Sequence, residues 1–243
     1  MIINKHSTID TSIVEEGAVL LIDKPLTWSS FDVVNKIRLS LKHAFGIKKI
    51  KVGHAGTLDP LATGLLIVCI GKKTKTIDLY QNLEKTYSGV ITFGAETPSF
   101  DAESDISATY PTQHIDDALI KDAIGSFTGD ILQKPPIFSA IKIKGTSSYT
   151  LARKGKEVEL SPRPITIYDF QCIDYTEPNL HFSITCSKGT YIRSIAHDFG
   201  KFLNSGGFLS ALSRDAIGPY KLEDALSITE FQSALQQLKT VHP

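Results

Sequence analysis

Hydrophobic residues along the chain follow two periods, one typical of strands and one typical of helices. A short strand is predicted at residues 18–23, which are apolar up to Ile22, and the uninterrupted apolar run at 65–70 predicts a buried strand. Strands are also predicted, from alternation or apolar composition, at residues 86–95, 165–173, 179–186 and 209–217. Apolar spacing of three and four residues predicts helices from Ser29 or Ser30 to about Phe45, at residues 116–127, 147–154 and 190–203, and a short helical tail from Glu223. This irregular order favours an α+β fold with a mixed, largely antiparallel sheet and flanking helices over a doubly wound fold.

Length and composition are those of a globular protein with one large domain or two small ones. The chain has 243 residues, of which 42% are hydrophobic and 21% charged. No apolar run is long enough to cross a bilayer, and the N-terminus lacks the apolar stretch of a signal peptide. The three cysteines, Cys69, Cys172 and Cys186, form no close pair. We therefore expect a cytoplasmic protein without disulfides and without a membrane partner.

Charge is balanced over the whole chain but uneven along it. With 26 basic and 26 acidic residues, the net charge is zero and does not by itself predict a nucleic-acid partner. Basic residues gather at 42–51, at 71–75 and at 142–156. Most such clusters are only solvated surfaces. The first two, however, flank the glycine-rich segment 53–64, so we expect them to share a surface with it.

Segment 53–64 is the most informative stretch, because it holds a single carboxylate in a stiff loop. It reads Gly-His-Ala-Gly-Thr-Leu-Asp-Pro-Leu-Ala-Thr-Gly, and the carboxylate belongs to Asp59. Glycine reaches backbone angles that other residues avoid, and Pro60 pushes Asp59 away from helical geometry. A turn alone can explain Asp-Pro. The whole segment instead indicates a rigid loop that presents one acid beside the core.

Tests for other chemistry narrow the role of that acid. Residues 71–74, Gly-Lys-Lys-Thr, lack the upstream glycine of a phosphate-binding loop, since Leu66 stands in its place. The histidines show no metal-site spacing, and no serine nucleophile elbow occurs. A lone carboxylate can attack a sugar carbon, whereas hydrolytic glycosidases need two. The sequence thus favours a rearrangement at a sugar carbon, without metal or cofactor.

Five collinear motifs resemble the TruB family of tRNA pseudouridine synthases, over about residues 18–220. They are Asp23-Lys24-Pro25 with Ser29-Ser30, residues 53–72, Lys85-Thr86-Tyr87, residues 135–142 with 149–155, and residues 186–193. The resemblance implies isomerisation of uridine to pseudouridine at position 55 in the TΨC loop of tRNA. It also implies the pseudouridine-synthase fold, with a central catalytic cleft. The partner would be the T-arm stem-loop of tRNA, and we expect a monomer.

The same resemblance implies roles for individual residues. Asp59 would be the catalytic aspartate, Tyr87 would stack on the flipped uracil and serve in proton transfer, and Arg193 would pair with Asp59. An extruded base needs aromatic walls, which agrees with the role of Tyr87. His54, Tyr191, Leu212 and Lys24 would contact the substrate nucleotide or its site.

Each of these residues also has a simpler interpretation. Tyr87 taken alone is an aromatic side chain on a sheet surface, His54 a loop histidine, and Leu212 a core residue. Arg193 lies in the first turn of a predicted helix, where the helix dipole disfavours a cation. That mismatch indicates a specific anionic partner, although exposure to water would also remove the cost.

The sequence departs from the family pattern in two places. The Lys-Pro motif commonly has a glycine two residues after the proline, and here Thr27 stands there. The turn must then avoid positive φ, or Thr27 is strained. Many members also carry a C-terminal RNA-binding domain of the PUA type. We expect instead an N-terminal extension (1–17), a catalytic domain (18–220) and a short helical tail (221–243).

Two rival functions remain open at this stage. One is a non-catalytic RNA-binding or tRNA-folding module that keeps the fold. The other is a small-molecule glycosidase, which would require a second essential carboxylate.

Overall fold

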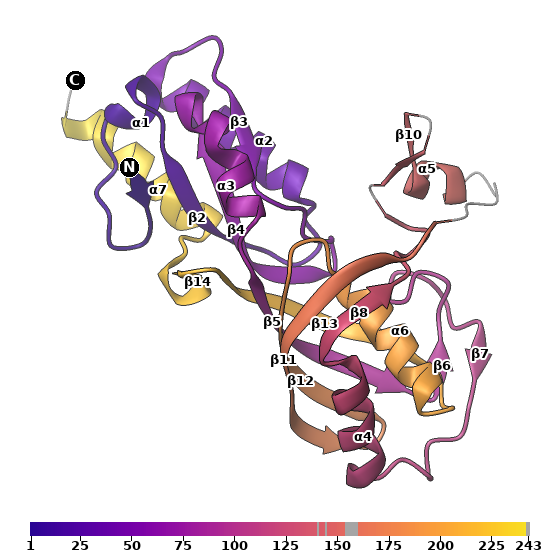
Figure 1. The fold of residues 1–243 in the computed structure, drawn as a ribbon. Helices are drawn as coiled ribbons and strands as arrows, with labels where there is room; N and C mark the ends of the chain where they lie inside the picture. The colour runs from indigo at the N-terminus through magenta and orange to yellow at the C-terminus, as the bar shows by residue number, and fades with distance from the viewer. Residues whose placement is uncertain (140, 144, 154–159, 242–243) are drawn as a thin grey trace. The chain divides into compact units, whose positions relative to one another are not determined.

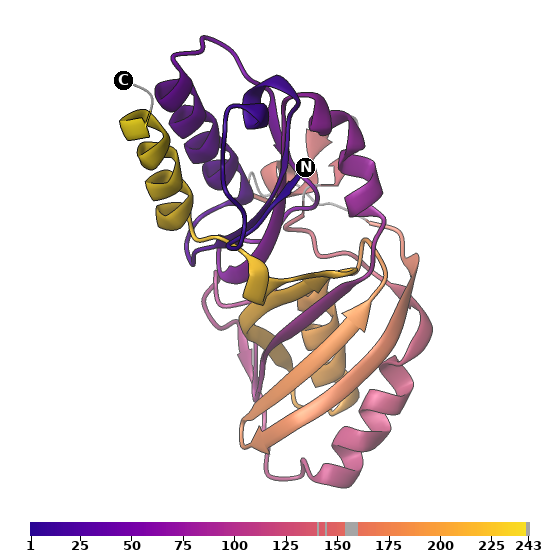
Figure 2. The same ribbon diagram turned by 90° about the vertical axis from the view of Figure 1, so that its left-hand side faces the viewer.

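A computed structural model describes residues 1–139, 141–143, 145–153 and 160–241, and the chain forms two compact units (Figures 1 and 2). The first unit consists of Met1–Tyr87 and Ser213–Pro243, and the second of Ser88–Leu212. Both the N-terminal extension and the C-terminal tail expected from the sequence therefore belong to the first unit.

The first unit is built around a mixed sheet. Strand β2 (Val19–Lys24) pairs parallel with β1 (Ile2–Ile3) and antiparallel with β4 (Ala62–Ile70). Strand β3 (Val52–His54) pairs antiparallel with β4 and forms a hairpin with it. The short elements α1 (Ser12–Glu15), η1 (Gly71–Thr76) and α3 (Ile77–Gln81) complete the N-terminal part. The unit is completed by segments from the C-terminal part of the chain. These are the end of β13 (Gly207–Ile217), β14 (Tyr220–Lys221), η2 (Leu222–Asp224) and α7 (Ile228–Val241).

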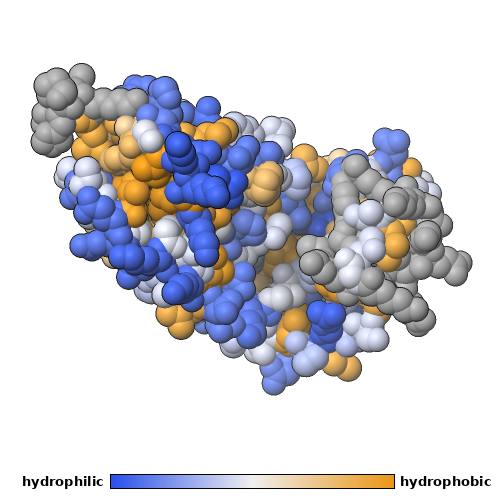
Figure 3. Space-filling view, turned by 90° about the horizontal axis from the view of Figure 1, so that it is seen from above, coloured by the Kyte–Doolittle hydropathy of each residue, from blue (hydrophilic) through white to orange (hydrophobic). Residues whose placement is uncertain are grey.

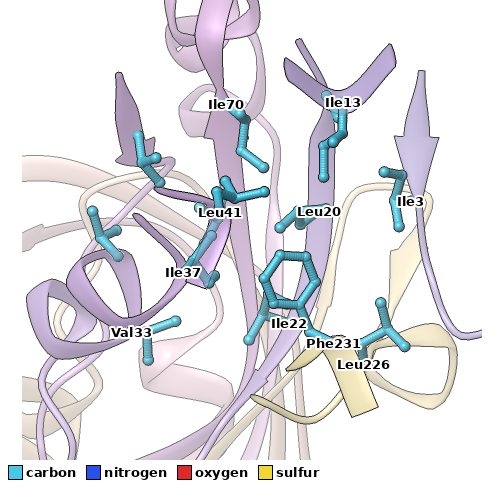
Figure 4. Close-up of a cluster of buried hydrophobic side chains, with 14 of the residues drawn as sticks. Ile3, Ile13, Leu20, Ile22, Val33, Ile37, Leu41, Ile70, Leu226 and Phe231 are labelled. Carbon is cyan, nitrogen blue, oxygen red and sulfur yellow. The ribbon is translucent and has the colours of Figure 1, made fainter. Parts of the chain in front are cut away.

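Both faces of this sheet are buried, which explains the uninterrupted apolar runs in the sequence. Leu66, Val68 and Ile70 of β4 pack into one hydrophobic cluster, and Leu65, Ile67 and Cys69 pack into another. Figure 4 shows the first cluster, in which side chains from helix α2 (Ser30–Phe45) and from α7 meet β2. The labelled members on these elements are Leu20, Ile22, Val33, Ile37, Leu41 and Phe231.

Helix α2 begins and ends where the sequence predicts. Ser29 caps it, because its hydroxyl accepts from the Asp32 N–H while the Asp32 carboxylate accepts from the Ser29 N–H. Gly46, with φ of 63°, ends the helix in the left-handed conformation. The helix thereby fixes Ser30, its first residue, beside the site described below.

The second unit contains a sheet in the order β13, β5, β12, β11, β8. The strands that first appear here are β5 (Lys85–Phe93), β12 (Asn179–Cys186), β11 (Arg163–Thr176) and β8 (Gly129–Gln133). Helices α4 (Asp117–Phe127) and α6 (Ile192–Phe202) pack through an aromatic cluster centred on Phe199, with Phe93, Phe127 and Phe170 around it. Shorter elements are β6 (Ala95–Glu96), β7 (Ala108–Thr109), β9 (Lys142–Ile143), β10 (Thr146–Ser147) and α5 (Ser148–Arg153).

The α+β class and the mixed, mainly antiparallel sheet are confirmed, while some boundaries differ from prediction. Strand β11 extends beyond Ile173 to Thr176, and its pairing with β12 continues to the Thr176–Asn179 pair despite two shifts in register. Strand β4 begins at Ala62, so the end of the glycine-rich segment is already strand. The third basic cluster includes Lys144, Lys154 and Lys156, which lie outside the described residues.

The surface is mixed in character. In Figure 3, hydrophilic side chains cover much of the visible face, with apolar side chains between them. No helix in the described part of the chain is both long and apolar enough to span a bilayer.

Candidate active site

Asp59 lies in the loop that joins β3 to β4. Of the three glycines in segment 53–64, Gly56 and Gly64 have positive φ, at 109° and 104°, whereas Gly53 belongs to β3. A Cβ on Gly64 would lie 2.5 Å from the backbone oxygen of Arg214. Glycine is therefore required at 64 for two reasons, its backbone angle and the close approach of β13.

Five consecutive carbonyl groups of this loop are held by hydrogen bonds. Those of Gly56 and Thr57 each accept from the guanidinium of Arg214, at 3.4 Å. The Leu58 carbonyl accepts from the Ser30 hydroxyl at 3.1 Å, and the same hydroxyl accepts from the Leu58 N–H at 2.8 Å.

The last two carbonyls are held in the same way. The Asp59 carbonyl accepts from the Ala62 N–H at 3.1 Å, and the Pro60 carbonyl accepts from the Thr27 N–H at 2.8 Å. The stiffness inferred from glycine and proline alone is thus supplied mainly by groups from three other segments.

Lys24 is a fully buried cation beside the loop. Its ammonium group donates to the carbonyls of Trp28 (2.6 Å), Pro25 (3.0 Å) and Pro60 (3.4 Å). Burial lowers the pKa of Lys24 to about 8, while the charge of Asp59 opposes this shift and that of Arg214 adds to it. Lys24 was predicted to contact the substrate, and in the structure its ammonium donates to backbone carbonyls.

His54 and Tyr87 also belong to the first unit. His54 is half-buried at the end of β3, and burial lowers its pKa, although the Gly56 backbone acts in the opposite direction. Its Nδ1 is buried and makes no hydrogen bond of normal geometry to the described residues.

Tyr87 is 8% exposed on the inward side of β5, two residues after Lys85. The ammonium of Lys85 donates to the carbonyls of Gln81 and Leu83, both at 2.6 Å, and so anchors the start of that strand.

The remaining predicted residues belong to the second unit. Arg193, 6% exposed near the start of α6, lies 3.5 Å from the carboxylate of Asp101 and donates to the carbonyls of Ser99 and Phe138. Asp101, which the sequence did not single out, is thus an anionic neighbour of Arg193 at the helix start, where the dipole disfavours a cation. The pairing of Arg193 with Asp59 stays a prediction.

Tyr191 and Leu212 have different surroundings. The buried Gln133 side chain binds both backbone groups of Tyr191, accepting from its N–H at 2.8 Å and donating to its carbonyl at 3.0 Å. This clamp fixes the residue that precedes α6. Leu212, on β13, is half-buried rather than part of the buried core.

The two basic clusters near the loop meet each other at the far end of its hairpin. The Gly71 N–H donates to the Lys51 carbonyl at 2.8 Å, so residues 48–51 and 71–75 are neighbours. From Ala62 to Ile70, β4 spans about 26 Å at the usual rise per residue. The two basic clusters were expected to share a surface with segment 53–64. They lie together at the opposite end of the hairpin from Asp59.

Three residues that hold these groups were not predicted from the sequence, namely Asp101, Gln133 and Arg214, and Ser30 was named only as a motif residue and a possible helix start. Of the three, Arg214 left a signal, as a lone cation within the apolar pattern that predicts β13. Among the described residues, no group of three or more His, Cys, Asp or Glu side chains is arranged to hold a metal ion.

Comparison with solved structures defines the class of fold. The chain resembles one from a Cbf5–Nop10–Gar1 complex, with a TM-score of 0.66 and 24% identity, over 88% of this chain and 53% of that one. It also resembles a chain from an H/ACA RNP bound to a substrate RNA containing 2′-deoxyuridine, with a TM-score of 0.68 and 20% identity, over all of this chain and 64% of that one. The present chain thus spans between about half and two thirds of these solved chains, and they inform on fold alone.

Sequence comparison defines the family. Residues 42–192 match the N-terminal domain of the TruB family pseudouridylate synthases. A protein of Flavobacterium johnsoniae called tRNA pseudouridine synthase B is 52% identical, over 91% of this chain and 97% of its own length. A protein of the same name from Phocaeicola vulgatus is 50% identical, over 92% and 95%. The chain therefore belongs to the TruB family of pseudouridylate synthases, and it is an isomerase.

Proposed function

We propose that this protein converts uridine to pseudouridine in tRNA, at position 55 of the TΨC loop. Two curated relatives with about 50% identity over nearly their whole length are tRNA pseudouridine synthases, and this likeness is the observation that carries the proposal. The anchored loop around Asp59 supports it, because a reaction at one sugar carbon needs a carboxylate held in one place.

The reaction breaks the bond from ribose C1′ to uracil N1 and forms a bond from C1′ to C5. The C5 proton leaves, N1 gains a proton, and no atom is lost overall. Asp59 begins the reaction, either by attack on C1′ or by promoting elimination to a glycal, and the proposal holds for both paths.

The other residues bind and orient the nucleotide. Tyr87 stacks on the flipped uracil and serves in proton transfer, and Arg193 pairs with Asp59. His54, Tyr191 and Leu212 contact the nucleotide or fill the space that it vacates. Lys24 contributes through the loop, because its ammonium group binds the Pro60 carbonyl next to Asp59.

The direct test is Asp59→Asn in a tritium-release or mass-shift-labelling assay on a tRNA transcript. We expect the variant to lose pseudouridine formation while its tRNA affinity persists, because the amide keeps the shape of the side chain but not its nucleophilicity. Asp105→Asn, at an exposed loop position, serves as the matched control and should retain full activity. Turnover by the Asp59 variant would refute the assignment.

The same assay separates the rival functions. A wild-type protein that binds tRNA without forming pseudouridine would be a binding module. Hydrolysis of small glycosides, with no response to tRNA, would indicate a glycosidase with a second essential carboxylate.

A further inference from the structure

We propose that Arg214 is a positioning residue, which acts with Ser30 to fix the loop so that the Asp59 carboxylate stays aimed at the reacting carbon. This inference rests on the proposed function. Arg214 acts through the backbone of the residues just before Asp59, because its guanidinium donates to the carbonyls of Gly56 and Thr57.

The geometry of Arg214 singles it out. Its side chain is 1% exposed, and its guanidinium binds the carbonyls of Gly56, Thr57 and Leu65 through three different nitrogens. The bond from Nε to Leu65 is short, at 2.7 Å, and ties the guanidinium to β4. The two remaining nitrogens then reach across to the loop, so Arg214 links the start of the strand to the residues before Asp59.

The electrostatic cost of this arrangement favours a functional role. A buried cation is expensive unless it is paired, and among the described residues no carboxylate lies within salt-bridge distance of Arg214. Lys24 is buried near the same loop, and the charge of Arg214 lowers the pKa of Lys24. Arg214 and Lys24 therefore repel each other in a buried place where apolar side chains would cost less free energy. Such a violation of the usual packing rules is expected at functional sites.

Arginine is required for this linkage rather than any cation. Its planar guanidinium presents five donors in a fixed fork, whereas a lysine ammonium is a point charge on a flexible stem. Lysine at 214 would keep the charge and, like Lys24, could donate three hydrogen bonds, but all three would leave one nitrogen, so it could not reach carbonyls that Arg214 binds through three separate nitrogens. A displacement of the reacting group by about 1 Å can slow a reaction about 100-fold.

The experiment compares Arg214→Lys with Arg38→Lys. Arg38 also donates to a backbone carbonyl of the same unit, that of Val52, but does not contact the loop. Single-turnover rates, tRNA dissociation constants and hydrogen exchange of the peptide 55–62 are measured for both variants and for the wild type.

We expect Arg214→Lys to react about 10- to 100-fold more slowly at saturating tRNA, with a dissociation constant within about threefold of the wild type. Its loop amides should exchange faster, and Arg38→Lys should match the wild type in all three measurements. An unchanged single-turnover rate would overturn the proposal, as would a weaker affinity with an unchanged rate. An inactive wild type would instead refute the proposed function.

Ser30→Ala gives a second, independent route, because it is a small change that removes both hydrogen bonds to Leu58. We expect slower turnover and faster exchange of the same loop. If hydrogen exchange of the loop becomes faster in Ser30→Ala while the single-turnover rate stays the same, the position of the loop does not limit the chemistry and the proposal fails. This outcome decides the question even if Arg214→Lys does not fold. If both single variants fold, their effects on rate should be less than additive, because both act through one loop.

Discussion

At the scale of single residues, Thr27 carries strain in the turn that supports the loop around Asp59. Its φ is 70°, which is rare for a β-branched residue, and the alternative that the sequence left open is thereby resolved in favour of strain. The Thr27 side chain is exposed, while its N–H holds the Pro60 carbonyl. Strain of this kind persists where the surroundings fix the backbone, and it clusters near functional sites.

Replacing Thr27 by glycine should therefore stabilise the protein. Relief of the left-handed conformation is worth about 1–2 kcal/mol, and the added freedom of the unfolded chain costs about 0.5–1 kcal/mol. We expect a net gain of about 1 kcal/mol in the free energy of unfolding, measured by urea titration. Thr27→Ala keeps a Cβ and should give no such gain. Equal gains in the two variants would show that φ is not the source of strain.

At the scale of elements, α6 contacts the segment around Phe100, which lies far before it in the sequence, through the buried His197. The ring of His197 stacks on Phe100, with centroids 3.8 Å apart, and Phe100 itself has positive φ. The neighbouring Asp101 pairs with Arg193 on the same helix. Burial lowers the pKa of His197 to about 4, the charge of Lys201 adds to the effect, and that of Glu96 opposes it.

This shift predicts a loss of stability in acid. Between pH 6.5 and about 4 the unfolded chain binds a proton at His197 that the folded protein does not, so stability falls as the pH drops through this range. The full shift corresponds to about 3 kcal/mol. His197→Phe keeps the stacking surface and should flatten the dependence of unfolding free energy on pH, whereas the exposed His43→Gln should not. An unchanged slope in His197→Phe would mean that other groups cause the acid sensitivity.

The elements themselves were largely predictable, because their signals are local. Helix α2 has its capping residues and its apolar spacing within one stretch of sequence, and β4 shows its burial on both faces as an apolar run. The anchors of the loop were not predictable, since they come from positions remote in sequence. Arg214 lies more than 140 residues from the carbonyls that it binds, and the residues around it in the sequence do not indicate these partners.

At the scale of the whole molecule, the residues assigned to the reaction are divided between two units. Asp59, His54 and Tyr87 belong to the first, and Tyr191 and Arg193 to the second. Each set is held by buried hydrogen bonds within its own unit, by Ser30 and Arg214 in one case and by Gln133 in the other. The proposed roles concern only the reacting nucleotide and the loop that carries it, so we expect a short RNA element to be sufficient as substrate.

An isolated T-arm stem-loop is such an element, and we expect it to react nearly as well as full-length tRNA. RNA loops are recognised by shape and by stacking on aromatic side chains, which the proposed roles of Tyr87 and Tyr191 provide. Stacking contributes about 1–3 kcal/mol per base, enough to retain a short RNA. The lysines at 48–51 and 71–75 lie about 26 Å along β4 from the loop end of the hairpin, so they would contact RNA away from the reacting base.

Comparing kcat/KM for the stem-loop and for the full transcript at several salt concentrations tests this expectation. Values within about tenfold of each other would support local recognition, with any remaining advantage of the transcript falling as salt screens phosphate contacts. Lys72→Gln, in the exposed part of that lysine cluster, should leave turnover of the stem-loop unchanged. A loss of several hundredfold on the stem-loop would mean that the enzyme requires the rest of the tRNA, and that recognition extends well beyond the residues assigned to the two units.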